Sequence, residues 1–212
     1  MTEHEPGTTS PPGAQIWRTA ARRQMPWKNG YGVSYEVATM PDGAGLDNFD
    51  WRISFAEITK DGPFSTFEGV DRILVLIDGH SLRLTIGGTP HEVQLYQPVL
   101  FDGGSRTSCE LPVGATRDLN IMTRRNRVSA QLEILDISPG APVTTAASPT
   151  VALVTLTGPV VVSSGDIDIA SLDPGDGMLW THPFPLKLTA PVPALLAAIH
   201  LAYLPRRRLS LR

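Results

Sequence analysis

The chain has little cysteine and little charge. Cys109 is its only cysteine among 212 residues, which excludes an internal disulfide and a thiolate metal cluster. Charged residues make up 18% of the sequence, and the formal net charge is -3, without the basic excess that is typical of nucleic-acid-binding proteins. The one concentrated basic run, Arg206–Arg208, reads as a solvated tail. We therefore expect no nucleic-acid partner.

Long apolar runs are also missing. No stretch reaches the roughly 18 apolar residues of a membrane span, and the polar N-terminal residues lack the apolar segment of a signal peptide. With 42% hydrophobic residues, the chain is long enough to bury a sizeable core. We expect a globular, cytoplasmic protein that has no membrane partner.

Histidines are few and scattered. The five are His4, His80, His91, His182 and His200. No two lie within four residues of each other, whereas metal sites on strands often use closely spaced imidazoles or carboxylates. Nucleophile-elbow, phosphate-loop and dinucleotide signatures are absent from the sequence. The sequence therefore predicts no metal and no cofactor.

Short strands separated by turns dominate from residue 51 onward. Trp51–Ala56 alternates, with Arg52 and Ser54 on the face opposite the aromatic residues. Ala194–Leu204 is apolar and fits a helix or a buried strand, and we favour the strand. Regularly spaced strands and turns predict an all-β sandwich or barrel. The other strand candidates are 72–77, 82–86, 93–96, 99–101, 119–122, 151–156, 160–162, 167–169, 178–180 and 186–188.

The two halves of the chain share a rhythm of strand, turn, strand and glycine-rich turn, which predicts a duplicated barrel, with a single large sandwich as the alternative. We expect a disordered tail over residues 1–14 and a first barrel with the ligand pocket over 15–137. A linker over 138–149 follows. A second barrel, completed by N-terminal strands, spans 150–205, and 206–212 is a basic tail.

A glycine-rich segment, Met25–Gly32, follows neither a helical nor a strand pattern. Its glycines permit tight turns and close backbone approaches, so the segment predicts a folded loop that presents Trp27, Lys28 and Asn29. These residue types suit a small anionic or amide-bearing ligand. The alternative is a surface turn in which Trp27 fills the core.

Several cationic and amide residues fall on shared strand faces. Period-two arithmetic brings Arg52, Arg72, Asn120 and Arg124 around one cavity if those faces turn inward. A guanidinium binds a carboxylate through two parallel hydrogen bonds, so such a cavity suits an acidic metabolite. The alternative is that the arginines form buried ion pairs. Candidate partners for such pairs are Asp50, Glu57, Asp71 and Asp118.

The segment Gly62–Gly69 combines aromatic and hydroxyl side chains between glycines. It predicts a lid in which Phe64 and Phe67 cover a ligand and Ser65 donates a hydrogen bond. Alternatively both phenylalanines plug the mouth of a barrel, the role we favour for Phe67.

Five blocks of the sequence resemble the HutD/Ves family. They span about residues 15 to 125, in the order of the family, whereas the second half matches in rhythm and length. The blocks are Met25–Gly30, Asp50–Glu57, Gly62–Phe67, Gly69–Arg72 and Asp118–Met122. The resemblance implies a bicupin-like fold, two jelly-roll β-barrels in one chain.

Cupin barrels commonly bind a metal through histidines and a glutamate on early strands. The comparable stretch Pro63–Gly79 has no histidine, and Arg72 stands near the place of an acidic ligand, so the resemblance implies a metal-free pocket. Family members encoded with histidine-degradation genes are thought to sense or buffer a pathway intermediate, with N-formylglutamate or urocanate as candidates. Tyr31 departs from the glycine usual at its position and leaves the ligand's identity open.

Our leading hypothesis is a non-catalytic protein that binds a carboxylate metabolite and moderates histidine utilisation. Trp27 and Phe64 would pack on the ligand, and Lys28 and Arg72 would bind carboxylates. Orienting contacts would come from Asn29, Ser65 and Asn120, with Arg52 and Arg124 as further candidates. The rivals are a metal-independent isomerase or epimerase using His80 or His91 as base, and an interaction module with a vestigial pocket. A homodimer stays an open alternative.

Overall fold

Strands account for almost all regular structure in the computed structural model, which describes residues 13–27 and 30–205. The chain divides into two compact units. In the described chain, the larger unit comprises residues 19–27, 30–134 and 199–205, and the smaller unit comprises 13–18 and 135–198. A single 3-10 turn, Thr19–Ala21, is the helical element of the described residues.

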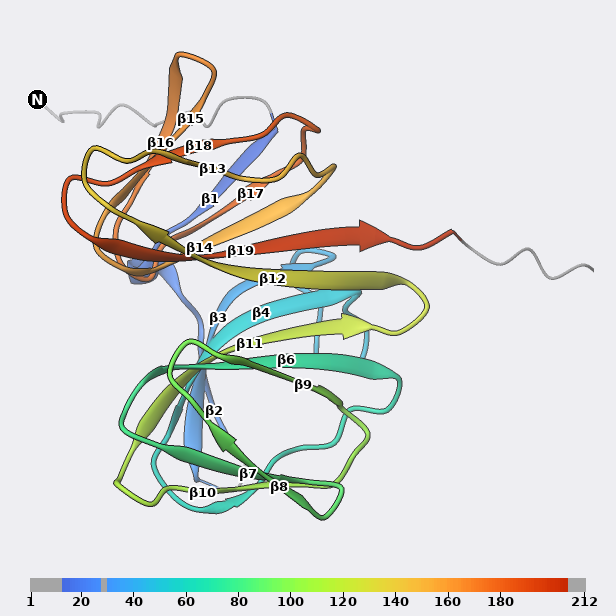
Figure 1. Cartoon of the computed structure of the whole chain (residues 1–212). Helices are drawn as coiled ribbons and strands as arrows, with labels where there is room; N and C mark the ends of the chain where they lie inside the picture. The colour runs from blue at the N-terminus through green and yellow to red at the C-terminus, as the bar shows by residue number, and fades with distance from the viewer. Residues whose placement is uncertain (1–12, 28–29, 206–212) are drawn as a thin grey trace, which may run out of the picture. The chain divides into compact units, whose positions relative to one another are not determined.

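The larger unit contains two antiparallel sheets, and Figure 1 labels all of their strands except β5. The six-stranded sheet has the order β2 (Gln24–Pro26), β3 (Gly32–Met40), β4 (Trp51–Ile58), β11 (Thr116–Arg124), β6 (Val70–Asp78) and β9 (Pro98–Asp102). The four-stranded sheet has the order β5 (Gly62–Pro63), β10 (Thr107–Glu110), β7 (Leu82–Ile86) and β8 (Thr89–Val93).

Apolar side chains fill part of the space between these two sheets. Leu74 and Leu76 of β6 pack in one buried cluster with Leu82 and Leu84 of β7 and Cys109 of β10. Each of the four leucines is fully buried. At about 25 cal/mol per Å² of apolar surface, such a cluster is the main stabilising term of a small sandwich.

The central strands of the six-stranded sheet are buried on both faces. All of the first six residues of β4 are buried, so Arg52 and Ser54 lie inside the protein together with the aromatic residues of the opposite face. A strand with one solvated face would have exposed alternate residues. The polar side chains of β4 must therefore find partners inside the unit.

The smaller unit also contains two antiparallel sheets. The five-stranded sheet has the order β1 (Ala14–Trp17), β17 (Gly177–Trp180), β14 (Val151–Thr157), β19 (Ala194–Tyr203) and β12 (Val128–Ile137). The chain passes from one unit to the other within β12 and within β19. The four-stranded sheet has the order β13 (Val143–Thr144), β18 (Lys187–Thr189), β15 (Val160–Ser164) and β16 (Ile167–Leu172).

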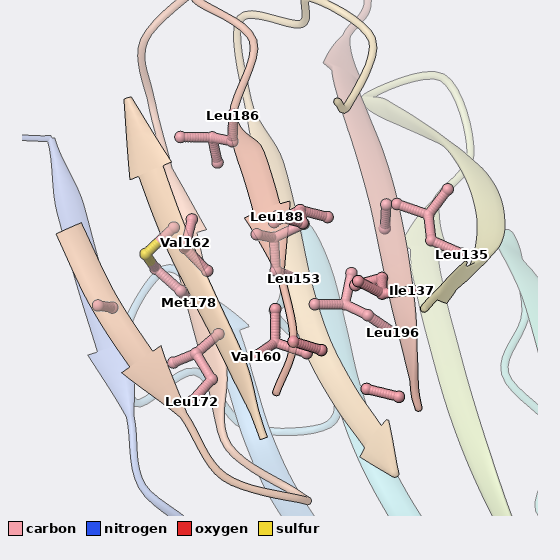
Figure 2. Close-up of a cluster of buried hydrophobic side chains, with 14 of the residues drawn as sticks. Leu135, Ile137, Leu153, Val160, Val162, Leu172, Met178, Leu186, Leu188 and Leu196 are labelled. Atoms are coloured by element: carbon pink, nitrogen blue, oxygen red, sulfur yellow. The ribbon is translucent and has the colours of Figure 1, made fainter. Parts of the chain in front are cut away.

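The core of the smaller unit consists mainly of aliphatic side chains, together with Met178 and Trp180. Figure 2 shows side chains of both sheets, among them Leu153, Val162 and Leu196, directed toward one another. All three are fully buried.

The prediction of an all-β chain is confirmed, and so is the strand predicted over residues 194–204, which is β19. The segment expected to be a linker, 138–149, contains the short strand β13, which pairs with β18. In the described residues each unit consists of two separate open sheets, and no strand order closes into a barrel. None of the described residues forms a helix long and apolar enough to cross a membrane.

Leu153 and Ile167 offer a test of the smaller unit's core. Leu153 is fully buried, whereas Ile167 on β16 is 70% exposed. Leu153→Ala should lower the free energy of unfolding by about 2–5 kcal/mol because it leaves a cavity, and Ile167→Ala should change it by less than about 0.5 kcal/mol. Urea titration followed by circular dichroism measures both. Equal effects of the two substitutions would contradict this packing.

Candidate ligand-binding site

A cavity of about 610 Å³ opens in the larger unit. Its lining runs from exposed loop residues, such as Leu46 and Thr66, to buried strand residues, such as Arg72 and Asn120. The full lining is Met25, Pro26, Trp27, Ser34, Leu46, Asp47, Arg52, Ser54, Ala56, Pro63, Phe64, Ser65, Thr66, Phe67, Glu68, Arg72, Asn120, Met122 and Arg124.

The floor of the cavity is set by the register of three strands. Met122 of β11 lies opposite Arg52 of β4 on one side and opposite Arg72 of β6 on the other. Two residues along β11, Asn120 lies opposite Ser54. Directly opposed residues point to the same face of a sheet, so two guanidinium groups and an amide share this inner face.

Arg52 is held by neighbouring side chains. Its Nε donates to Glu36 Oε2 at 2.9 Å and its Nη1 donates to Ser54 Oγ at 3.1 Å. The Met25 sulfur lies 4.0 Å from Nη2. Both members of the ion pair are largely buried, with 6% and 18% of their side chains exposed. Arg52 is therefore a neutralised part of the cavity wall.

Arg72 is surrounded by aromatic rings. Its guanidinium carbon lies 5.3 Å from the ring centroid of Phe64, 5.8 Å from that of Phe67 and 4.9 Å from that of Phe101. No described residue accepts a hydrogen bond from its buried Nε, and no ion pair joins Arg72 to a described carboxylate. Cation–π contacts stabilise the charge in place.

Burial also changes the acid–base properties of Arg72. It lowers the pKa of this guanidinium to about 10, against the attraction of Asp118 and with the repulsion of Arg52. The group stays protonated at neutral pH. The cavity therefore has, on its floor, a cation that no described carboxylate pairs with directly, and such a charge attracts an anionic ligand.

Asp118 is the buried acid closest to this arrangement. It lies two residues before Asn120 on β11, opposite the apolar residues Ala56 and Leu76. Its side chain is 1% exposed, and its Oδ1 accepts no hydrogen bond from any described residue. Burial raises the pKa of Asp118 to about 7, although the charge of Arg72 opposes the shift.

The first part of the predicted glycine loop, residues 25–27, forms one wall of the cavity, but Met25 and Pro26 belong to strand β2 and Gly32 to β3 rather than to a loop. Trp27 N donates to Gly32 O at 2.9 Å and Gly30 N donates to Trp27 O at 3.0 Å, which folds the segment into a hairpin between β2 and β3. A Cβ on Gly32 would collide with the carbonyl oxygen of Glu57 and would lie 3.2 Å from the Trp27 ring, so a close approach requires glycine there.

Trp27 is fixed by two contacts. Its Nε1 donates to Ser34 Oγ at 2.9 Å, and its ring meets Phe64 edge-on at a centroid distance of 5.7 Å. The indole nitrogen is therefore occupied, and the cavity meets Trp27 as an apolar surface.

Arg124 joins the two loops of the cavity rim, which are the loop 41–50 between β3 and β4 and the loop 64–69 between β5 and β6. Its Nη2 donates to Asp47 O at 3.0 Å and its Nη1 donates to Glu68 O at 3.3 Å. Its guanidinium also lies 5.1 Å from the ring centroid of Phe49, which is fully buried beneath the first loop. These contacts give Arg124 a structural role at the rim.

The structure brings together seven of the nine residues predicted for the site. Ser65 lies at the exposed rim, and Phe64 is buried. Lys28 and Asn29 lie outside the described residues. The seven are Trp27, Arg52, Phe64, Ser65, Arg72, Asn120 and Arg124.

The ion-pair alternative holds in one case, with a partner that we did not predict. Arg52 pairs with Glu36. Three of the four carboxylates considered as partners interact elsewhere: Asp50 with Arg127, Asp71 with Arg125, and Glu57 with the Tyr35 hydroxyl. The fourth, Asp118, attracts Arg72 through its charge without a direct ion pair.

Other features of the site also escaped sequence reasoning. Glu36 sits on β3 beside a register shift between Glu36 and Ala38, and no local pattern announces such a bulge. Phe67 lines the cavity and also packs against the buried cluster of Phe49, Val70 and Met122. It therefore combines the two roles considered for it, covering a ligand and filling the core at the mouth. Tyr31, which departs from the family's glycine, packs on Gly62 and does not line the cavity.

The histidines of the larger unit's loops and strands lie away from this lining. His80 and His91 are exposed. In the part of the chain that the structure describes, no three His, Cys, Asp or Glu side chains gather as potential metal ligands.

Comparison with solved structures shows the type of fold to which the chain belongs. Solved all-β structures with a cupin-like fold match the chain at TM-scores of 0.68–0.70 and 11–13% identity. Identity this low shows the fold alone, so the chain is a cupin-like β protein.

The family follows from the sequence match. The family model named HutD matches residues 19–197, and the chain belongs to the HutD family. This confirms the resemblance drawn from the five sequence blocks.

Three relatives illustrate the match. An uncharacterised 21.2 kDa protein in the hutC 3' region of Pseudomonas putida is 41% identical over 58% of this chain and 64% of its own length. Protein Ves of Citrobacter koseri is 37% identical over 54% of this chain and 61% of its own length. HutD from Pseudomonas fluorescens SBW25 has a TM-score of 0.77 at 28% identity, covering 91% of this chain and 100% of that chain. The matches to the two curated relatives thus span less than two thirds of their length.

Asp118→Asn tests the buried acid. A folded-state pKa of about 7, above the ordinary 3.8, means that the folded protein binds the extra proton between these values. The carboxyl group therefore lowers the free energy of unfolding by a growing amount as pH rises through this window, and by a constant amount above it. Relative to wild type, Asp118→Asn should gain about 2.5 kcal/mol more stability at pH 8 than at pH 5. Thermal unfolding measures the difference, and equal offsets at both pH values would refute the assignment.

Arg124→Ala tests the connection between the loops of the rim. Loss of two hydrogen bonds should speed amide exchange at residues 45–49 and 65–68 by roughly fivefold, as expected for about 1 kcal/mol of local stability. Hydrogen–deuterium exchange measures this. Arg106→Ala, at an exposed position outside the lining, is the control. Unchanged exchange in Arg124→Ala would show that the two loops keep their conformation without the hydrogen bonds from Arg124.

Proposed function

We propose that the larger unit binds a small carboxylate metabolite, without catalysis, and that this binding moderates histidine utilisation. The observation that carries the proposal is Arg72: a buried guanidinium on the floor of a cavity, with a hydrogen-bond donor that no described residue uses. A buried donor left unsatisfied costs about 1–3 kcal/mol, and a ligand carboxylate would recover that cost.

Cavity size favours binding over a vestigial pocket. Side chains leave about 610 Å³ open, within the roughly 300–1,000 Å³ typical of small-molecule sites. An interaction module that no longer binds a ligand would have no reason to keep a buried cation beside an open space.

Individual roles follow from the chemistry of the lining. Arg72 would bind the carboxylate, and the unpaired Oδ1 of Asn120 would accept a hydrogen bond from an N–H or O–H group of the ligand. Trp27 and Phe64 would pack against its body. Ser65, at the rim, would contact the end of the ligand nearer solvent. Arg52 and Arg124, already engaged, would shape the wall and the rim.

A place in histidine utilisation is supported by two relatives. One is described as a protein in the hutC 3' region, and another is HutD itself. N-formylglutamate and urocanate both carry a carboxylate and an N–H group, and so both match Arg72 and Asn120. We further propose that the two units correspond to the two jelly-roll halves of a bicupin.

An isomerase or epimerase is less well supported. The imidazoles considered as bases, His80 and His91, are exposed and do not line the cavity. Asp118 has a pKa near neutrality, as a general base would need, but it does not line the cavity either. A general base must reach the proton that it abstracts.

Arg72→Ala tests the proposed function. Removing the buried cation should weaken binding of N-formylglutamate or urocanate by about 30- to 150-fold, which corresponds to roughly 2–3 kcal/mol. Isothermal titration calorimetry measures the affinity, and circular dichroism checks that the variant is folded.

Arg83→Ala provides the matched control, because Arg83 is a half-exposed arginine of the same unit that pairs with Glu92 and Glu110 outside the cavity lining. It should bind like wild type. Equal affinity of Arg72→Ala and wild type would remove Arg72 from the site, and binding of neither metabolite by wild type would refute the proposed function.

A further inference from the structure

We propose that the cavity takes up one proton from solvent together with its carboxylate ligand, and that Asp118 receives this proton. The inference rests on the proposed function, because it requires a carboxylate to bind at Arg72. It adds that the protein's affinity for the ligand depends on pH through a residue that does not touch the ligand.

The position of Asp118 provides the geometric argument. It shares the inner face of β11 with Asn120 and Met122, and both of these line the cavity. Asp118 itself is one step deeper, with Ala56 and Leu76 on either side in register. Its Oδ1 lacks a donor among the described residues, so the ionised carboxylate has little to replace the water that it loses.

The charged and titratable groups around Asp118 come from each neighbouring strand. From β6, Arg72 is the cation that acts on it. From β10 of the other sheet, the buried thiol of Cys109 is affected by its charge: burial, with the charges of Asp61 and Asp118, raises the pKa of that thiol. From β4, Arg52 is neutralised by Glu36 of β3. Arg72 is therefore the stabilising charge on which ionised Asp118 depends.

Ligand binding changes this balance. Without ligand, the guanidinium of Arg72 attracts Asp118, although the two form no direct ion pair among those of the described residues. With a carboxylate bound at Arg72, one cation would face two carboxylates in a buried space. Two carboxylates that share a site disfavour each other's ionisation, and one of them takes up a proton.

The sign of the pH dependence follows. Asp118 titrates near pH 7 in the free protein, and the ligand's charge shifts its titration to higher pH. Between the two values the complex holds a proton that the free protein does not, so affinity falls as pH rises through this range. A shift of one unit corresponds to a tenfold loss of affinity.

Calorimetry on wild type and Asp118→Asn tests the proposal. The probes are N-formylglutamate and trans-cinnamate, a planar monocarboxylate, because neither titrates near neutral pH. Titrations at pH 7.5 in phosphate and in Tris, which differ in ionisation enthalpy, should reveal uptake of more than about a quarter of a proton per ligand by wild type. Between pH 6.5 and pH 9 its affinity should fall by about tenfold.

Asp118→Asn should bind without proton uptake and with an affinity that varies by less than about twofold over the same range. The control is Asp136→Asn, an exposed position on β12, which should behave as wild type. Binding by wild type without proton uptake would overturn the coupling and leave the proposed function intact, whereas failure of wild type to bind either probe or urocanate would overturn both.

Infrared difference spectroscopy on wild type keeps the test open if Asp118→Asn does not fold. Appearance of a protonated-carboxyl stretching band when the ligand binds supports the proposal, and its absence contradicts it.

Discussion

The larger unit depends on keeping a guanidinium charged inside a β-sandwich without a direct carboxylate partner. Burying a charge is costly, and the structure meets the cost at Arg72 through three aromatic rings and a more distant acid. Several other features follow from this constraint. Phe64 and Phe67 of the segment 64–67 lie against the cation, and the residue opposite it on β11 is the uncharged Met122.

Arg52 and Arg72 show two solutions to the same problem on one sheet. They flank Met122 symmetrically in register, yet Arg52 has its own carboxylate, whereas Arg72 does not. The guanidinium of Arg52 is neutralised by Glu36 and serves as part of the cavity wall. The guanidinium of Arg72 has no direct carboxylate partner among the described residues and can still pair with a ligand. This difference separates the structural arginine from the candidate functional one.

Much of the cavity could be predicted from strand periodicity. Alternation along β4 and β11 assigns Arg52, Asn120 and Arg124 to one inner face, because side chains two residues apart point the same way. Glu36 could not be assigned in this manner, since a bulge interrupts the pairing of β3 with β4. That Arg72 lacks a direct partner could not be predicted either, because it depends on the register between neighbouring strands. The residue pattern of a single strand does not determine that register.

For the fold, the strands could be predicted from the sequence, whereas the order of the strands in the sheets could not. Turn residues and alternation predict the strands, including β19, because both are local signals. Sheet order is not local: β1 pairs with β17 across more than 150 residues of chain. The polar face of β4 likewise lies in a cavity formed with the distant segments 25–27 and 63–68.

Arg124 has a consequence for how ligand preference can diverge among related proteins. A single side chain bonds the main chain of both rim loops, at Asp47 and at Glu68. Insertion or deletion in either loop would move a carbonyl oxygen out of reach and release the other loop as well. Divergence at this rim should therefore proceed by exchange of side chains on loops of constant length, with Leu46, Ser65 and Thr66 as the positions most free to vary.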